Sequence, residues 1–138
     1  MSTGEFTWPV RVYYEDTDHG GVVYYANYLK FMERARTEHL RSFGIEQDAL
    51  RREGVVFVVR RVEVDYLRPA VFNDELVVSA VVHHLGRASI TYQQQVVRKQ
   101  EPEQILCAGK IKIASLDAHT MRPAPVPEYV IAEMSRGN

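Results

Sequence analysis

A single helical stretch followed by several long β-type runs is the feature that most limits how this 138-residue chain can fold. From Ala26 to Phe43 apolar residues return every three or four positions, as in an amphipathic helix about 25 Å long. Asn27 is its predicted N-cap, and Gly44 is its predicted left-handed stop. The predicted buried stripe carries Tyr28, Met32, Ala35, His39 and Phe43, with Leu29 and Leu40 beside it, and leaves Lys30, Glu33, Arg34, Arg36 and Arg41 largely outside it.

Extended segments lie on both sides of this helix. Val10, Val12 and Tyr14 alternate with polar or charged neighbours, which predicts a strand with these three residues facing inward. After Gly54, four runs rich in β-branched residues predict antiparallel strands at 55–67, 75–85, 88–98 and 104–116, with breaks at 68–74, 85–87 and 100–102. One strand, one long helix and a four-strand meander predict an α+β domain in which a bent sheet wraps the helix. We expect residues 1–138 to form this one domain, with residues 118–138 as a peripheral tail that holds a short helix or turn after Pro127.

The composition limits the classes of partner. With 46% hydrophobic residues, 25% charged residues and a net charge of -1, the chain has no general attraction for nucleic acid or an anionic membrane. Its start lacks a leader pattern and no run approaches the roughly 20 apolar residues that span a bilayer, so we expect a cytoplasmic protein without membrane insertion. Cys107 is the single cysteine, which excludes an internal disulfide and gives no metal-ligand spacing. We expect neither a metal nor a cofactor.

The segment YYEDTDHGGVVYY, residues 13–25, combines three carboxylates, a histidine and two glycines between the first strand and the helix. Charged groups beside apolar and aromatic residues indicate a half-buried polar site. A calcium loop starting at Asp16 is excluded, because its twelfth position is Asn27 where an EF-hand requires a bidentate glutamate. Two interpretations remain open: an acidic turn that favours the helix N-terminus, and a catalytic site.

The run RVYYEDTDHGGVVYYANYLKFMERARTEHLRSFG, residues 11–44, resembles the signature of the hot-dog-fold acyl-CoA thioesterases. These belong to the hydroxybenzoyl-CoA thioesterase superfamily, and the likeness is to its YbgC-like, Tol-Pal-associated branch. The resemblance continues more weakly through VEVDYLRPAVFNDEL and the later strands, so it covers most of the chain. It implies a long central helix wrapped by a bent sheet, and hydrolysis of an acyl-CoA to the free acid and CoA.

The resemblance also implies residue roles. The family's catalytic aspartate opens the element D-x-x-G-x-V-Y, which this chain meets from Asp18 to Tyr24, including Val23. Asp18 is therefore the expected nucleophile or general base, and the two routes stay open. Backbone N–H groups around Tyr24 and Tyr25 are the expected oxyanion donors, since the first N–H groups of a helix lack intrahelical partners. Gly20 and Gly21 allow a tight turn and a close approach of the substrate.

One position departs from the family pattern. Most YbgC-like sequences carry a histidine where this chain has Tyr25, so that histidine's role does not transfer, although any non-proline residue still supplies a backbone N–H. His19 is the candidate replacement for the missing imidazole. Tyr14 is a candidate for orienting a carboxylate, against the alternative of a core tyrosine with a satisfied hydroxyl.

The expected partners follow from the substrate class. CoA phosphates require cations, and Arg87 at the turn after Gly86 is the preferred candidate among several arginines and lysines. The family binds the pantetheine arm between subunits, which implies a homodimer or homotetramer. Two other functions remain open: a thioesterase acting on acyl carrier protein within lipid synthesis, and a non-catalytic hot-dog binding module in envelope maintenance.

Overall fold

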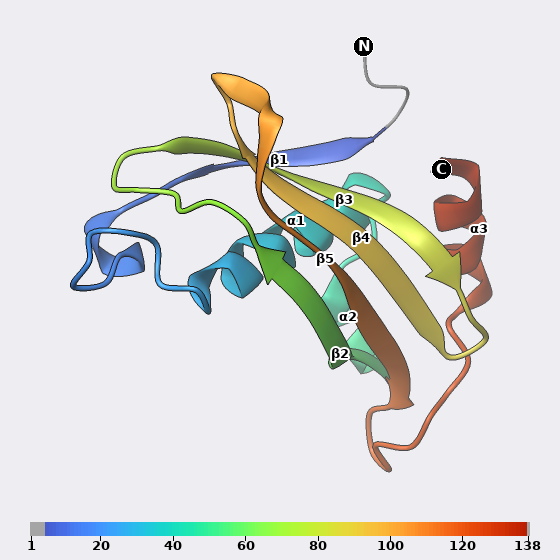
Figure 1. The fold of residues 1–138 in the computed structure, drawn as a ribbon. Coiled ribbons are helices and arrows are strands. Elements are labelled where there is room, and N and C mark those ends of the chain that lie inside the picture. Colours follow the sequence, from blue (N-terminus) through green and yellow to red (C-terminus); the bar gives the residue numbers. More distant parts are fainter. Residues whose placement is uncertain (1–4, 138) are drawn as a thin grey trace.

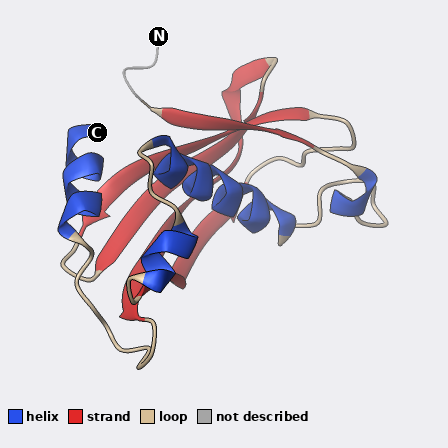
Figure 2. Cartoon of the chain, turned by 180° about the vertical axis from the view of Figure 1, so that it is seen from behind, coloured by secondary structure: helices blue, strands red, loops and turns tan. Residues whose placement is uncertain are grey.

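The computed structural model describes residues 5–137 as one curved antiparallel sheet with helices against one face (Figure 1). The strands are β1 (Phe6–Arg11), β2 (Val55–Tyr66), β3 (Glu75–Leu85), β4 (Ser89–Arg98) and β5 (Glu101–Asp117). The helices are α1 (Asn27–Ser42), α2 (Gln47–Arg52) and α3 (Glu128–Gly137), and a short 3₁₀ turn spans Tyr14–Asp16. Figure 2 shows α1 lying across the sheet on the same face as α2. The predicted α+β class and the bent sheet around one long helix are confirmed.

The strand order is β1-β3-β4-β5-β2. Strands β3, β4 and β5 follow one another as predicted, but β2 pairs with β5 at the far edge, so the predicted four-strand meander was wrong for β2. Residues 67–74 connect β2 to β3. A chain extends by up to about 3.5 Å per residue, so this segment reaches across the roughly 14 Å between non-adjacent strands. Periodicity within β2 carries no information on which strand it pairs with.

Two element boundaries differ from expectation, and one short helix was not predicted. Asn27 is the first residue of α1 rather than its N-cap, because its side-chain amide donates to the Asp16 carbonyl at 2.9 Å. Residues 101 and 102 lie inside β5, and the hairpin turns at Lys99–Gln100 instead. Helix α2 was not predicted, since six residues are too few to establish a helical period. Gly44 has φ +78°, which confirms the left-handed stop after α1.

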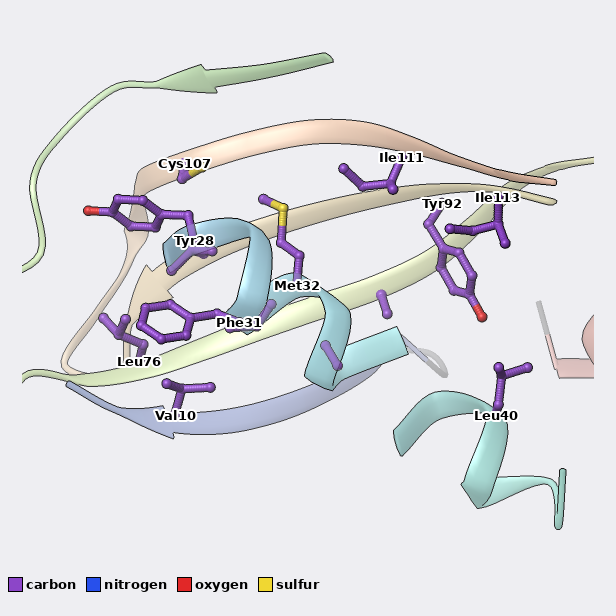
Figure 3. Close-up of a cluster of buried hydrophobic side chains, with 14 of the residues drawn as sticks. Val10, Tyr28, Phe31, Met32, Leu40, Leu76, Tyr92, Cys107, Ile111 and Ile113 are labelled. Atoms are coloured by element: carbon purple, nitrogen blue, oxygen red, sulfur yellow. The ribbon is translucent and has the colours of Figure 1, made fainter. Parts of the chain in front are cut away.

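The core fills the space between α1 and the sheet. Tyr28, Met32, Ala35 and Leu40 are buried as predicted, and Phe31 is completely buried between them. They meet alternate residues of the strands, among them Leu76 and Ile111 (Figure 3). Each such large apolar side chain stabilises the fold by about 1.5–3 kcal/mol. Val126, Val130 and Met134 are also buried, so the last part of the chain contributes to this core.

Two polar pairs lie inside this apolar layer. Arg36 is buried and its Nη1 donates to Gln94 Oε1 at 3.0 Å, so placing Arg36 outside the buried stripe was wrong. Arg36 lies one residue from Ala35, and its long side chain reaches the sheet although its backbone lies at the margin of the stripe. His39 Nδ1 and the Tyr92 hydroxyl lie 2.8 Å apart. Polar groups are tolerated here because each finds a partner across the helix–sheet boundary.

Among residues 5–137, no helix is long and apolar enough to cross a membrane.

Candidate active site

The segment between β1 and α1 is held against the segment between β2 and β3. Val12 N donates to Asp74 O at 3.0 Å, and Asn73 N donates back to Val12 O at 2.9 Å. Further along, Val23 N donates to Ala70 O at 2.9 Å, and Val22 forms an isolated bridge with Val71. Two loops that are far apart in sequence therefore form one structural unit.

Asp16 organises the first of these loops. Its Oδ2 accepts from Tyr13 N at 2.8 Å, and its carbonyl accepts from both Tyr24 N and Asn27 Nδ2 at 2.9 Å each. These bonds close the 3₁₀ turn and fix the point where α1 begins. The Asp16 side chain is half-buried and its Oδ2 holds the turn together, whereas Asp18 is exposed.

Asp18 stands at a tight turn with part of its carboxylate free. Its N–H donates to Val22 O at 2.9 Å, its carbonyl accepts from Gly21 N at 3.0 Å, and its Oδ1 accepts from Gly20 N at 2.8 Å. Gly21 has φ +81°, a left-handed conformation that favours glycine. Within residues 5–137, nothing donates to Asp18 Oδ2, and the residue is exposed. One oxygen is oriented by the backbone while the other is open to a ligand.

The start of α1 supplies free backbone donors next to this turn. The N–H of Tyr24 is bonded to Asp16 O, which removes Tyr24 as the expected oxyanion donor. In the described part of the chain, the N–H groups of Tyr25 and Ala26 have no hydrogen-bond acceptor. They stand at the positive end of the α1 dipole, where a developing negative charge is stabilised. The predicted donor at Tyr25 therefore has the required freedom.

An aromatic pocket of about 230 Å³ opens beside these donors. Its walls are Val23, Tyr25, Tyr28, Tyr66, Leu67, Arg68 and Pro69. The rings of Tyr25 and Tyr66 meet edge to face at 5.9 Å, and the Tyr28 hydroxyl accepts from Ala70 N at 2.9 Å. Burial raises the pKa of Tyr28 and that of Tyr66, and it raises the pKa of the Cys107 thiol to about 12, so none of the three ionises near neutral pH.

A half-buried ion pair supports the loop that forms the pocket wall. Arg98 Nε donates to Asp74 Oδ2 at 2.9 Å, and Arg98 Nη2 donates to Pro69 O at 2.7 Å. Asp74 Oδ2 also accepts from Val71 N at 2.9 Å. Charge-assisted bonds of this kind are the stronger ones in proteins, so β4 holds residues 69–74 in place.

Three predicted site residues are not joined to Asp18 by any hydrogen bond or ion pair within residues 5–137. Tyr14 is 75% exposed and stacks on Phe72 at 4.0 Å, so its predicted inward orientation was wrong: β1 ends at Arg11 and the 3₁₀ turn rotates the later side chains. His19 is exposed, and no hydrogen bond joins its ring to Asp18 within residues 5–137. Arg87 lies at the β3–β4 turn, whereas Asp18 lies near the start of β3. At about 3.3 Å per residue, β3 separates the two by roughly 30 Å within one chain.

Sequence reasoning missed Tyr66 and Ala70 as parts of the site. The apolar pair Tyr66-Leu67 before Arg68-Pro69 is the only local signal that a strand ends in something other than a plain turn. Their approach to Val23 and Tyr25 comes from the placement of β2 at the sheet edge. A single sequence does not reveal that long-range contact.

The fold agrees with comparisons to known proteins. Residues 12–134 match the family model described as the Thioesterase-like superfamily. The acyl-CoA thioester hydrolase YbgC of Escherichia coli O6:H1 is 40% identical over 136 residues, which cover 99% of this chain and all of that protein. The acyl-CoA thioesterase YbgC of Haemophilus influenzae is 42% identical over 133 residues, covering 96% of each chain. The solved structure of a probable thioesterase from Bartonella henselae is 33% identical, with a TM-score of 0.82 over 89% of this chain and 99% of that one.

A bent five-stranded sheet around a long helix, with an aspartate turn at the helix start, defines a hot-dog-fold thioesterase class. Within that class, the chain belongs to the YbgC family of acyl-CoA thioesterases.

Proposed function

We propose that this protein hydrolyses the thioester of an acyl-CoA, with Asp18 as nucleophile or as general base toward water. The observation that carries the proposal is that one folded segment holds both the open Oδ2 of Asp18 and the free N–H groups of Tyr25 and Ala26, and is closed by the Asp18 N–Val22 O and Tyr24 N–Asp16 O bonds. Asp18 attacks the carbonyl carbon or removes a proton from the attacking water, and the backbone donors hold the oxyanion that forms. The C–S bond then breaks and releases CoA as a thiolate, a good leaving group with a pKa of about 8.5 by analogy with cysteine.

The pocket walls suggest how the substrate lies. Tyr24, Tyr25 and Tyr66 present exposed aromatic surface, and Gly20 and Gly21 leave the backbone uncovered for a pantetheine arm. Arg68 lines the pocket and is exposed, so it is the cation of this chain best placed to meet a CoA phosphate. His19, exposed on the same turn, has no hydrogen bond that would give it a catalytic role in the single chain.

We further propose that two copies join through β2 to complete the site. β2 is a twelve-residue edge strand with Val59 50%, Val62 41% and Tyr66 46% exposed, followed by Leu67 at 57%. Long apolar edge strands are normally covered, because their free N–H and C=O groups pair readily with another strand. A two-fold contact would set β2 antiparallel to its copy. The Arg87 end of one subunit would then lie on the same side as the Asp18 loop of the other, which gives Arg87 a route to the CoA phosphates.

If two copies pair through β2, a single substitution in β2 should reduce the mass of the assembly in solution. Wild type is expected as a dimer or larger by light scattering after size exclusion, and Val62→Asp is expected to shift the mass to one chain and to lower turnover. A buried carboxylate at a strand pair is strongly unfavourable. Thr7→Asp is the matched control, because Thr7 is exposed on the other edge strand, β1. A fully active wild-type monomer at assay concentration would contradict the contact.

The activity is tested by thiol release from purified wild type on short, long and aromatic acyl-CoAs, and on the same acyl groups attached to acyl carrier protein. We expect turnover of at least one acyl-CoA class, as the acyl-CoA thioesterase relatives suggest. Faster release from the carrier-protein thioesters would favour that substrate instead. Release from neither series would leave a non-catalytic binding module as the better interpretation.

A further inference from the structure

A second pocket, of about 290 Å³, lies between α1, α2 and the sheet. Its apolar walls come from Leu40, Phe57, Val59, Ile90 and Ile113, and its polar lining comes from Glu33, Arg36, Thr37, Gln47 and Tyr92. Figure 3 shows Tyr92 and Ile113 projecting from the sheet on the side of Leu40. Arg36 is nine residues beyond the first residue of α1, which places it about 14 Å along the helix axis from the start of α1. It shares no lining residue with the aromatic pocket at that turn.

Arg36 is a buried cation without a carboxylate partner. It is 8% exposed, and among the described residues its side chain makes one hydrogen bond, from Nη1 to Gln94 Oε1 at 3.0 Å. Within residues 5–137, no carboxylate lies within 4.0 Å of its guanidinium. An arginine keeps its charge in proteins, and a buried charge is normally paired. The absence of a counter-charge is therefore a feature that requires an explanation.

The remaining guanidinium nitrogens of Arg36 are not fully buried, and Arg36 lines the pocket. Among the described residues, no fully buried side-chain nitrogen or oxygen lacks a hydrogen bond, so the unbonded guanidinium nitrogens keep access to the space that they line. Gln94 is fixed in turn, because its Nε2 donates to Met32 O at 3.0 Å and to Ser79 O at 3.1 Å. Arg36 is thus held from the sheet side, and it lines the cavity.

The other polar groups of the pocket do not form an ion pair with Arg36, although the Glu33 carboxylate attracts its charge from a longer distance. The Glu33 carboxylate is exposed at the pocket and accepts from the Thr37 hydroxyl, outside ion-pair distance of Arg36. The Tyr92 hydroxyl is bonded to His39. The interior therefore offers one positive charge and one phenol among aliphatic and aromatic walls. Such a site fits a small ligand with a short aliphatic part and a terminal carboxylate group, which is a planar, negatively charged hydrogen-bond acceptor.

We propose that this pocket binds a short aliphatic carboxylate, with the carboxylate on the Arg36 guanidinium and the chain against Leu40, Phe57 and Ile113. Two sources present this chemistry: a free carboxylic acid, and the distal carboxylate of a dicarboxylic acyl thioester. The second source rests on the proposed thioesterase activity and the first does not. A guanidinium fork pairs with a carboxylate through two parallel bonds, which a neutral amide of the same length does not reproduce.

The test compares binding of hexanoate and hexanamide to the full-length protein by titration calorimetry and by NMR shift changes at residues around Arg36. We expect hexanoate to bind at least about tenfold more tightly than hexanamide, which corresponds to about 1.4 kcal/mol. Arg36→Met should remove this preference. Glu33→Gln should strengthen hexanoate binding, since it removes the like charge at the mouth. Equal affinity for hexanoate and hexanamide, or no binding of either, overturns the proposal.

A second variant keeps the proposal testable if Arg36→Met fails to fold. Thr37→Phe places a bulky ring at the pocket from a half-buried helix position and should abolish hexanoate binding while Arg36 remains. Hexanoate binding that survives Thr37→Phe unchanged would show that the acid binds elsewhere. Turnover of adipoyl-CoA and hexanoyl-CoA then separates the sources. If wild type turns over adipoyl-CoA faster than hexanoyl-CoA and Thr37→Phe removes this difference, the pocket binds the distal carboxylate of the acyl-CoA substrate. If hexanoate binds but the two acyl-CoAs are turned over equally, the pocket binds a free carboxylic acid.

Discussion

Asp18→Asn is expected to reduce acyl-CoA hydrolysis by at least about 100-fold, whichever of the two chemical routes operates. Removing a positioned general base typically costs about 10²–10⁴ in rate, and removing a nucleophile costs at least as much. The substitution keeps the turn, because the Asn side-chain oxygen still accepts the Gly20 N–H that Asp18 Oδ1 accepts at 2.8 Å. Thiol release under saturating substrate, with unfolding midpoints measured in parallel, gives the result.

Glu15→Gln is the matched control for this experiment. Glu15 is an exposed carboxylate three positions upstream, and within residues 5–137 its side chain has no hydrogen bond or ion pair. The same loss of one negative charge in the same loop should leave turnover within about twofold of wild type, because surface charges act weakly at a distance in salt. Equal losses in the two variants would point to the loop's net charge, and unchanged turnover in Asp18→Asn would show that the catalytic group is another residue.

Local patterns predicted most of the fold, and long-range pairing accounts for what they missed. The helix at 27–42 and the strands were predicted within a few residues, because burial imposes a period of 3.6 on α1 and β-branched residues concentrate in the strands. The position of β2 beside β5 was not predictable in the same way, since the pairing depends on how residues 67–74 cross the sheet. The burial of Arg36 was also missed, because its partner Gln94 lies on β4.

The candidate site also contains residues that a local motif predicted and residues that only the folded structure identifies. Asp18, Gly20 and Gly21 lie in one turn and were identified from a contiguous motif by resemblance. The oxyanion donors needed the hydrogen-bond pattern, which assigns the Tyr24 N–H to Asp16 O and leaves the Tyr25 N–H free. Tyr14 was misplaced because the alternation of β1 stops at Arg11 and a 3₁₀ turn follows. A short irregular segment gives no periodic signal from which side-chain direction can be read.

His39 is expected to make the protein acid-sensitive well above the range where most carboxylates titrate. It is 4% exposed, and burial lowers its pKa from 6.5 to about 4. Between these values the unfolded chain binds a proton at His39 and the folded protein does not. The free energy of unfolding therefore falls as the pH is lowered from about 7 to about 4.5, and the contribution of this one group is roughly 2–3 kcal/mol.

The part of the pH dependence that comes from His39 should be lost when both partners of the buried pair are made apolar. His39→Leu combined with Tyr92→Phe removes two polar groups that face each other at 2.8 Å, and replacing both partners is much less disruptive than leaving one unsatisfied. Urea unfolding at several pH values gives the free energy of unfolding as a function of pH. Between pH 7 and pH 4.5 this free energy should fall by roughly 2 kcal/mol or more further in wild type than in the double variant. His84→Gln, at an exposed position on β3, should keep the wild-type slope. Identical slopes for wild type and the double variant would mean that His39 takes up its proton in the folded state, and that the core around Tyr92 admits water.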